Sequence, residues 1–301
     1  MLRHFPLYEF PYRIQDPMEK KYPTWLLPNL LSLDAPIVAV AWAWMFAQTW
    51  RVQWINQNVY YLLPGIVWII YVFDRFLDNK VSSGQRALKS SRHAFHAKHS
   101  RVMQLVAFAV AGFCLALTFQ LPLAIFAHAI PVLLMVGIYF FFAIFSETDS
   151  HQPQLFKNMI AGYTFSYGVA LGSFFFRPST DWFELIFTQE HLLFGLLCTC
   201  NITAIDIWEA SRASNEKEVK GVYGFSLTVP LLILVMLSLT LAFIGEIHAR
   251  PFFLAIMVAA GLLQLINKNR SRFSLNALRT MADLALIVPF PIFWLYLEYL
   301  K

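Results

Sequence analysis

Between Val102 and Ser146 the chain reads VMQLVAFAVAGFCLALTFQLPLAIFAHAIPVLLMVGIYFFFAIFS, with no Asp, Glu, Lys or Arg. These 45 residues are more than twice the roughly 20 that one transmembrane helix needs. Pro122 interrupts the stretch near its middle, and a proline inside a helix kinks or breaks it. The stretch therefore predicts two membrane-spanning helices joined by a tight turn.

The rest of the chain has the same character. Of its 301 residues, 58% are hydrophobic and only 14% are charged, whereas soluble domains carry about 25% charged residues. We expect a single all-α domain over residues 1–301, a polytopic membrane bundle of nine transmembrane helices. The predicted spans are 35–50, 56–77, 102–119, 122–145, 156–176, 190–210, 224–245, 251–267 and 280–299.

Composition excludes several other classes of protein. The three cysteines all lie in apolar stretches, which gives no support for a disulfide framework or a tetrahedral zinc site. The net charge of +5 does not indicate nucleic acid as a partner, because the basic residues do not gather on one binding face. We interpret these residues as a record of membrane topology.

Basic residues test the predicted spans, because short cytoplasmic loops are enriched in Lys and Arg. With nine spans, 18 of the 23 basic residues fall on one side of the membrane. This bias predicts a cytoplasmic N-terminal segment, residues 1–32, and basic cytoplasmic loops at 79–101 and 211–223. The expected location is an integral membrane, the cytoplasmic membrane in a prokaryote.

Two pairs of acidic residues follow the predicted cytoplasmic ends of helices. Asp74 and Asp78 are four residues apart at the end of the second helix, and Asp206 and Glu209 are three apart near the end of the sixth. Each spacing puts both carboxylates on one helical face. Carboxylate oxygens suit Mg²⁺, and neighbouring bases would neutralise a phosphate, so the pattern indicates a substrate with a diphosphate and an apolar tail. The alternative is that these acids are interfacial anchors and surface ion pairs.

This arrangement resembles the UbiA superfamily of intramembrane prenyltransferases, whose members have nine helices and Asp-rich motifs at the ends of the second and sixth. The first motif typically reads Asn-Asp-x-x-Asp-Arg-x-x-Asp, and residues 74–78 reproduce its last five positions. Ile70 and Tyr71 replace its opening Asn and Asp, and Ser211 replaces one acid of the second motif. A Lys opening the fifth helix is also typical of the family, and Lys157 stands in that place.

The resemblance implies transfer of an isoprenyl group from an isoprenyl diphosphate to a lipophilic aromatic acceptor, with Mg²⁺ as cofactor and membrane lipids as surroundings. It implies metal ligation by the two acid pairs, catalytic roles for Arg75, Lys157 and Arg212 on the leaving group, and substrate binding by four further residues. These are Arg86, Arg92, Asn201 and Tyr163.

Two other interpretations stay open. Because both motifs are incomplete, the chain is alternatively a degenerate relative that binds isoprenoid or serves as a membrane scaffold. A transporter is the third hypothesis, although the span interiors lack charged residues and no internal repeat divides the helices evenly. Arg279 and Asp283, four apart at the start of the last helix, are interpreted as a structural pair.

Overall fold

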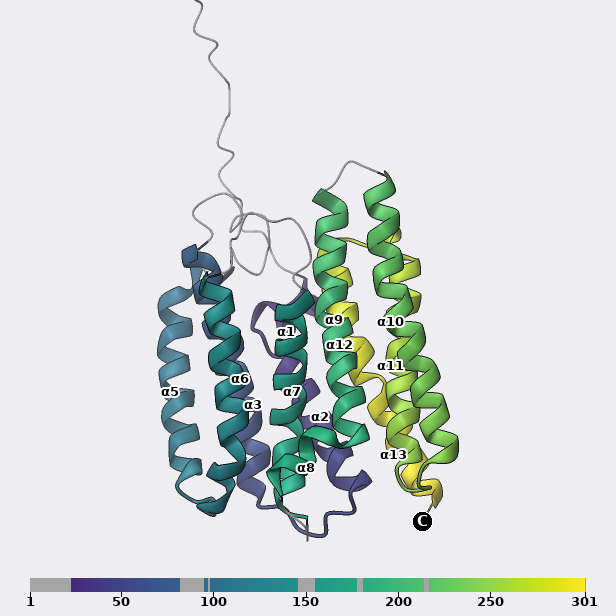
Figure 1. The fold of residues 1–301 in the computed structure, drawn as a ribbon. Helices are drawn as coiled ribbons and strands as arrows, with labels where there is room; N and C mark the ends of the chain where they lie inside the picture. Colours follow the sequence, from purple (N-terminus) through teal and green to yellow (C-terminus); the bar gives the residue numbers. More distant parts are fainter. Residues whose placement is uncertain are drawn as a thin grey trace, which may run out of the picture.

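The computed structural model describes residues 23–81, 95, 96, 98–145, 155–177, 181–213 and 217–300. Every regular element in these ranges is a helix, which confirms the predicted all-α class. The long helices lie side by side and roughly parallel (Figure 1). The elements are η1 (Thr24–Leu26), α1 (Leu27–Leu30), α2 (Asp34–Thr49), α3 (Gln57–Val81), α5 (Ser100–Thr118), α6 (Ala124–Phe145), α7 (Leu155–Phe175), α8 (Trp182–Phe187), α9 (Gln189–Ala213), α10 (Lys217–Ile244), α11 (Arg250–Lys268), η3 (Arg270–Arg272), α12 (Leu275–Ile287) and α13 (Pro289–Leu300).

The long apolar helices are those of a multi-pass membrane protein. In the described part of the chain, seven helical stretches are long and apolar enough to cross a membrane, and an eighth counts if η1–α1 and α2, bent by 79°, form one span. The seven are Gln57–Leu77, Ser100–Thr118, Ala124–Phe142, Gln189–Arg212, Phe225–Ile244, Arg250–Lys268 and Leu275–Tyr299. The predicted span at 156–176 is a helix, α7, but it is not among these seven, and it carries Lys, Asn, Ser and Gly residues.

Several helix ends differ from the sequence-based boundaries. The last span begins at Leu275 rather than 280, because the Ser274 side chain accepts a hydrogen bond from the backbone N–H of Ala277 and caps the helix. It breaks at Val288, since Pro289 has no N–H to continue the hydrogen-bond ladder. α9 and α10 extend through most of the predicted loop at 211–223, and residues 24–30 of the N-terminal segment are helical.

Packing around α2, α9 and α11 forms the core. Trp42 stacks on Phe194 with ring centroids 4.3 Å apart, and Phe46 packs on Phe252 at 4.7 Å. Among the seven candidate spans, α9 is the most enclosed. In its apolar stretch 67% of the residues are buried, against 11% in α6. The central position of α9 places its polar residues inside the bundle, whereas α6 lies on the outside.

Candidate functional site

Asp74 lies in the last two turns of α3 and contacts groups from two helices. The Tyr139 hydroxyl on α6 donates a hydrogen bond of 2.8 Å to its Oδ1. The Arg75 guanidinium lies 3.5 Å from its Oδ2, and both side chains are largely buried, with 15% of Asp74 and 12% of Arg75 exposed. A buried carboxylate needs such partners, because burial of an uncompensated charge is costly. Asp74 is therefore held in place between α3 and α6.

Lys157, in the first turn of α7, lies beside the same contact. Its Nζ atom is 5.4 Å from the centroid of the Tyr139 ring, within the range of a cation–π interaction. Tyr139 consequently contacts Asp74 through its hydroxyl and Lys157 through its ring. Tyr139 on α6 therefore links Asp74 on α3 to Lys157 on α7.

Asp206 approaches this group from α9. Its Oδ2 accepts a hydrogen bond of 2.7 Å from the Asn158 amide on α7, which also donates to Thr203 at 3.3 Å. Asp206 interacts electrostatically with Lys157 and with Arg75, as well as with its own neighbour on α9, Glu209. Asp74 of the second predicted span and Asp206 of the sixth thus lie near the same base, Arg75.

We call Asp74, Arg75, Tyr139, Lys157, Asn158 and Asp206 the central polar cluster. Its members come from α3, α6, α7 and α9. Two carboxylates and two cations lie near one another between helices, an arrangement suited to an anionic group that binds both a metal and basic side chains. Among the described residues, no three His, Cys, Asp or Glu side chains gather closely enough to hold a metal by themselves.

Glu209 has a different principal partner. The Arg279 guanidinium of α12 donates to its Oε1 from Nε at 3.0 Å and also from Nη2. Arg279 is buried, whereas 41% of the Glu209 side chain is exposed. Arg279 therefore joins α12 to α9.

Three other predicted residues lie away from the central polar cluster. Arg212, at the end of α9, donates to the backbone carbonyl of Phe273 in the turn before α12. The Asn201 amide donates to the carbonyl of Ala282 on α12 at 3.3 Å. Tyr163 packs its ring on Gly195 and, edge to face, on His191 near the opposite end of α9. Arg86, Arg92 and the Asp78 side chain lie outside the described residues.

Sequence reasoning missed two members of the cluster, Tyr139 and Asn158. Tyr139 is a polar aromatic residue inside an apolar run, and Asn158 is an amide in the first turn of a predicted span. Polar residues in membrane segments usually face the bundle interior, and that rule is the signal that points to both. Which acids they contact depends on how α6 and α7 pack, and the sequence does not specify this.

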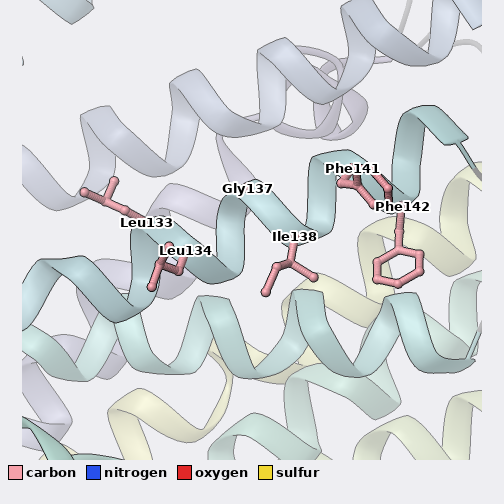
Figure 2. A pocket seen from close by; sticks show the side chains of 6 residues that line it. All are labelled: Leu133, Leu134, Gly137, Ile138, Phe141 and Phe142. Carbon is pink, nitrogen blue, oxygen red and sulfur yellow. The ribbon is translucent and has the colours of Figure 1, made fainter.

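The outer face of α6 carries an apolar hollow of about 500 Å³. Its lining comes from α6 alone, and Figure 2 shows Leu134, Ile138 and Phe142 projecting from the helix on either side of the bare Gly137. The hollow is open, and such an apolar surface suits contact with hydrocarbon chains. Tyr139, the residue after Ile138, points instead to Asp74.

Comparisons with protein-family models, with curated proteins and with solved structures give no match to this chain. The arguments for function accordingly rest on the central polar cluster and on the helices that hold it.

Proposed function

We propose that this chain is a UbiA-like membrane prenyltransferase that transfers an isoprenyl group from an isoprenyl diphosphate to a lipophilic aromatic acceptor. The observation that supports the proposal most directly is the convergence of Asp74, Arg75, Lys157 and Asp206 from α3, α7 and α9. Paired acids and bases between apolar helices fit a diphosphate with a long hydrocarbon tail.

The proposal includes nine spans, with α7 among them. α7 packs against α2, α6 and α9, and its inner face carries Asn158, Ser166 and Ser173 with their hydrogen bonds satisfied by other helices. Intramembrane polar residues are tolerated when they pair in this way. The N-terminus and the cluster end of the bundle would be cytoplasmic, in keeping with the distribution of basic residues.

Mg²⁺ would be held by Asp74, Asp78, Asp206 and Glu209, all hard oxygen ligands of the kind that this ion prefers. When bound, it would neutralise charge on the diphosphate. Arg75 and Lys157 would stabilise the same leaving group, because negative charge grows there as the allylic C–O bond breaks. Arg212 would assist them on the leaving group. Arg86 and Arg92 would bind the substrate from the cytoplasmic side, and Asn201 and Tyr163 would line the path of the apolar substrates.

One observation favours a second candidate, an isoprenoid-diphosphate-binding protein without catalysis. Glu209 is occupied by Arg279, and the positions of two family acids are Tyr71 and Ser211. Fewer carboxylates are then available for metal. In this case the central polar cluster would bind the donor without cleaving it.

The deciding experiment uses purified full-length protein in detergent with Mg²⁺, radiolabelled farnesyl or geranylgeranyl diphosphate and a membrane lipid extract. We expect a labelled apolar product and released diphosphate, both reduced roughly a hundredfold or more by Asp74→Asn, since lost electrostatic stabilisation has effects of that size. Glu184→Gln, on the exposed face of the short helix α8, is the matched control and should retain activity. Donor binding without diphosphate release would support the second candidate.

A further inference from the structure

A second polar group lies beside the central cluster, where the N-terminal elements meet α12. The Asn29 amide nitrogen donates to Asp34 at 2.6 Å and to Asp283 at 3.4 Å. Asn29 is 3% exposed, so the two carboxylates share a buried donor. Asp34 opens α2 and Asp283 lies in α12, which means that two acids distant in sequence meet at one nitrogen atom.

Tyr71 connects this group to the central cluster. It lies near Asp283, Asp34, Cys198 and Arg75, which places it among α2, α3, α9 and α12. Although these helices surround it, the Tyr71 side chain is only half-buried, as are Asp34 and Asp283. All three side chains therefore keep some accessible surface where the four helices meet.

Asn201 supplies an independent sign of a ligand in that region. Its side chain is 7% exposed and its Nδ2 donates to the Ala282 carbonyl, adjacent in sequence to Asp283. Its Oδ1 atom is buried and accepts no hydrogen bond. Cys198, one turn earlier on the same face of α9, lies near Tyr71. A buried amide oxygen of this kind calls for a donor, because leaving it unpaired costs about 1–3 kcal/mol.

We propose that Asp34, Asp283 and Asn201 bind the polar head of the acceptor, and that this head carries hydrogen-bond donors, such as phenolic hydroxyls, and no negative charge. All three residues offer acceptor oxygens, and two carboxylates repel an anionic head. This inference rests on the proposed function and deepens it, since Tyr71 and Arg75 place the acceptor head next to the diphosphate.

The test measures binding of two probes to the full-length protein in detergent, without donor, by isothermal titration calorimetry. Hydroquinone represents a neutral donor-bearing head, and 4-hydroxybenzoate represents an anionic one. We expect saturable hydroquinone binding at least tenfold tighter than that of 4-hydroxybenzoate. Asp283→Asn and Asn201→Leu should each weaken hydroquinone binding about tenfold, which is the loss of roughly one hydrogen bond.

Glu184→Gln, on the exposed face of α8, is the control variant for this test and should leave hydroquinone binding unchanged. Equal or tighter binding of 4-hydroxybenzoate to the wild-type protein would overturn the proposal, and so would hydroquinone binding that neither variant weakens. If a variant does not fold, the comparison of the two probes on the wild-type protein still tests the proposal. If the protein binds hydroquinone saturably but never cleaves an isoprenyl diphosphate, only the proposed catalytic function is contradicted.

Discussion

Tyr139 has two roles at the residue scale, because its hydroxyl and its ring contact different charged groups. The hydroxyl orients Asp74, and the ring face lies near Lys157. Asn158 acts similarly on Asp206. Neutral residues thus orient both acids of the cluster, while Asp74 also pairs directly with Arg75.

Tyr139→Phe separates these two roles, since it deletes the hydroxyl and keeps the ring. We expect Asp74 to lose its orientation, so that the apparent affinity for Mg²⁺ falls about three- to tenfold, as for one lost hydrogen bond of about 1 kcal/mol. Tyr139→Leu should weaken donor diphosphate binding further by removing the contact with Lys157. Titration of diphosphate release against Mg²⁺ checks the first effect, and an unchanged Mg²⁺ dependence in Tyr139→Phe would argue against a positioning role.

Glu209 is predicted to contribute to stability as well as to the site. Glu209→Leu removes an acceptor from the buried Arg279, and we expect a loss of about 1–3 kcal/mol in the free energy of unfolding. Glu209→Gln retains an acceptor and should recover most of that loss. If Glu209 also binds metal, Glu209→Gln will remain folded yet lose activity, whereas full activity in this variant would confine Glu209 to a structural role.

At the scale of elements, α7 and α9 approach closely because α7 presents glycine at the contact. A Cβ atom on Gly162 would lie 2.6 Å from the backbone nitrogen of Thr199, and one on Gly172 would lie 2.3 Å from a methyl carbon of Val59 on α3. Small residues allow such approach between membrane helices. Asn158 lies one turn before Gly162 on α7, so the close approach at Gly162 brings Asn158 within reach of Asp206.

Gly162→Ala should therefore push α7 from α9 and lower stability by about 1–3 kcal/mol, the usual cost of overpacking. Gly137→Ala on α6 is the matched control, because a Cβ atom there meets nothing within 4 Å. It should be neutral or slightly stabilising, since alanine favours helix over glycine. Thermal unfolding in detergent measures both, and equal melting temperatures for the two variants would contradict the close contact.

For the whole molecule, the arrangement of helices brings both acid pairs toward the same end of the bundle. α3 and α9 run in the same direction, so the acids near their C-terminal ends meet, while α7 runs the opposite way and contributes Lys157 from its first turn. The described helices include seven or eight candidate spans, and α7 would be the ninth if it crosses the membrane.

Topology can be checked with cysteines at the two ends of α7. Leu155→Cys places an exposed thiol at the first residue of this helix and Glu184→Cys places one beyond its end, in α8. The native Cys114, Cys198 and Cys200 are buried. In sealed vesicles of known orientation, a membrane-impermeant maleimide should label position 184 from the outer side and position 155 only from the cytoplasmic side. Labelling of both from one side would remove α7 from the spans.

The sequence by itself determined the helical class, the approximate positions of the long helices and the locations of the acids along them. Long uncharged runs have no stable alternative in a bilayer, since each backbone polar group must be satisfied within its own helix. The partners of those acids were decided only by tertiary structure. Tyr139 on Asp74, Asn158 on Asp206, Arg279 on Glu209 and the meeting of Asp34 with Asp283 all depend on which helices touch and at what height. Helix contacts arise from side-chain packing between distant segments, which one sequence read along its length does not specify.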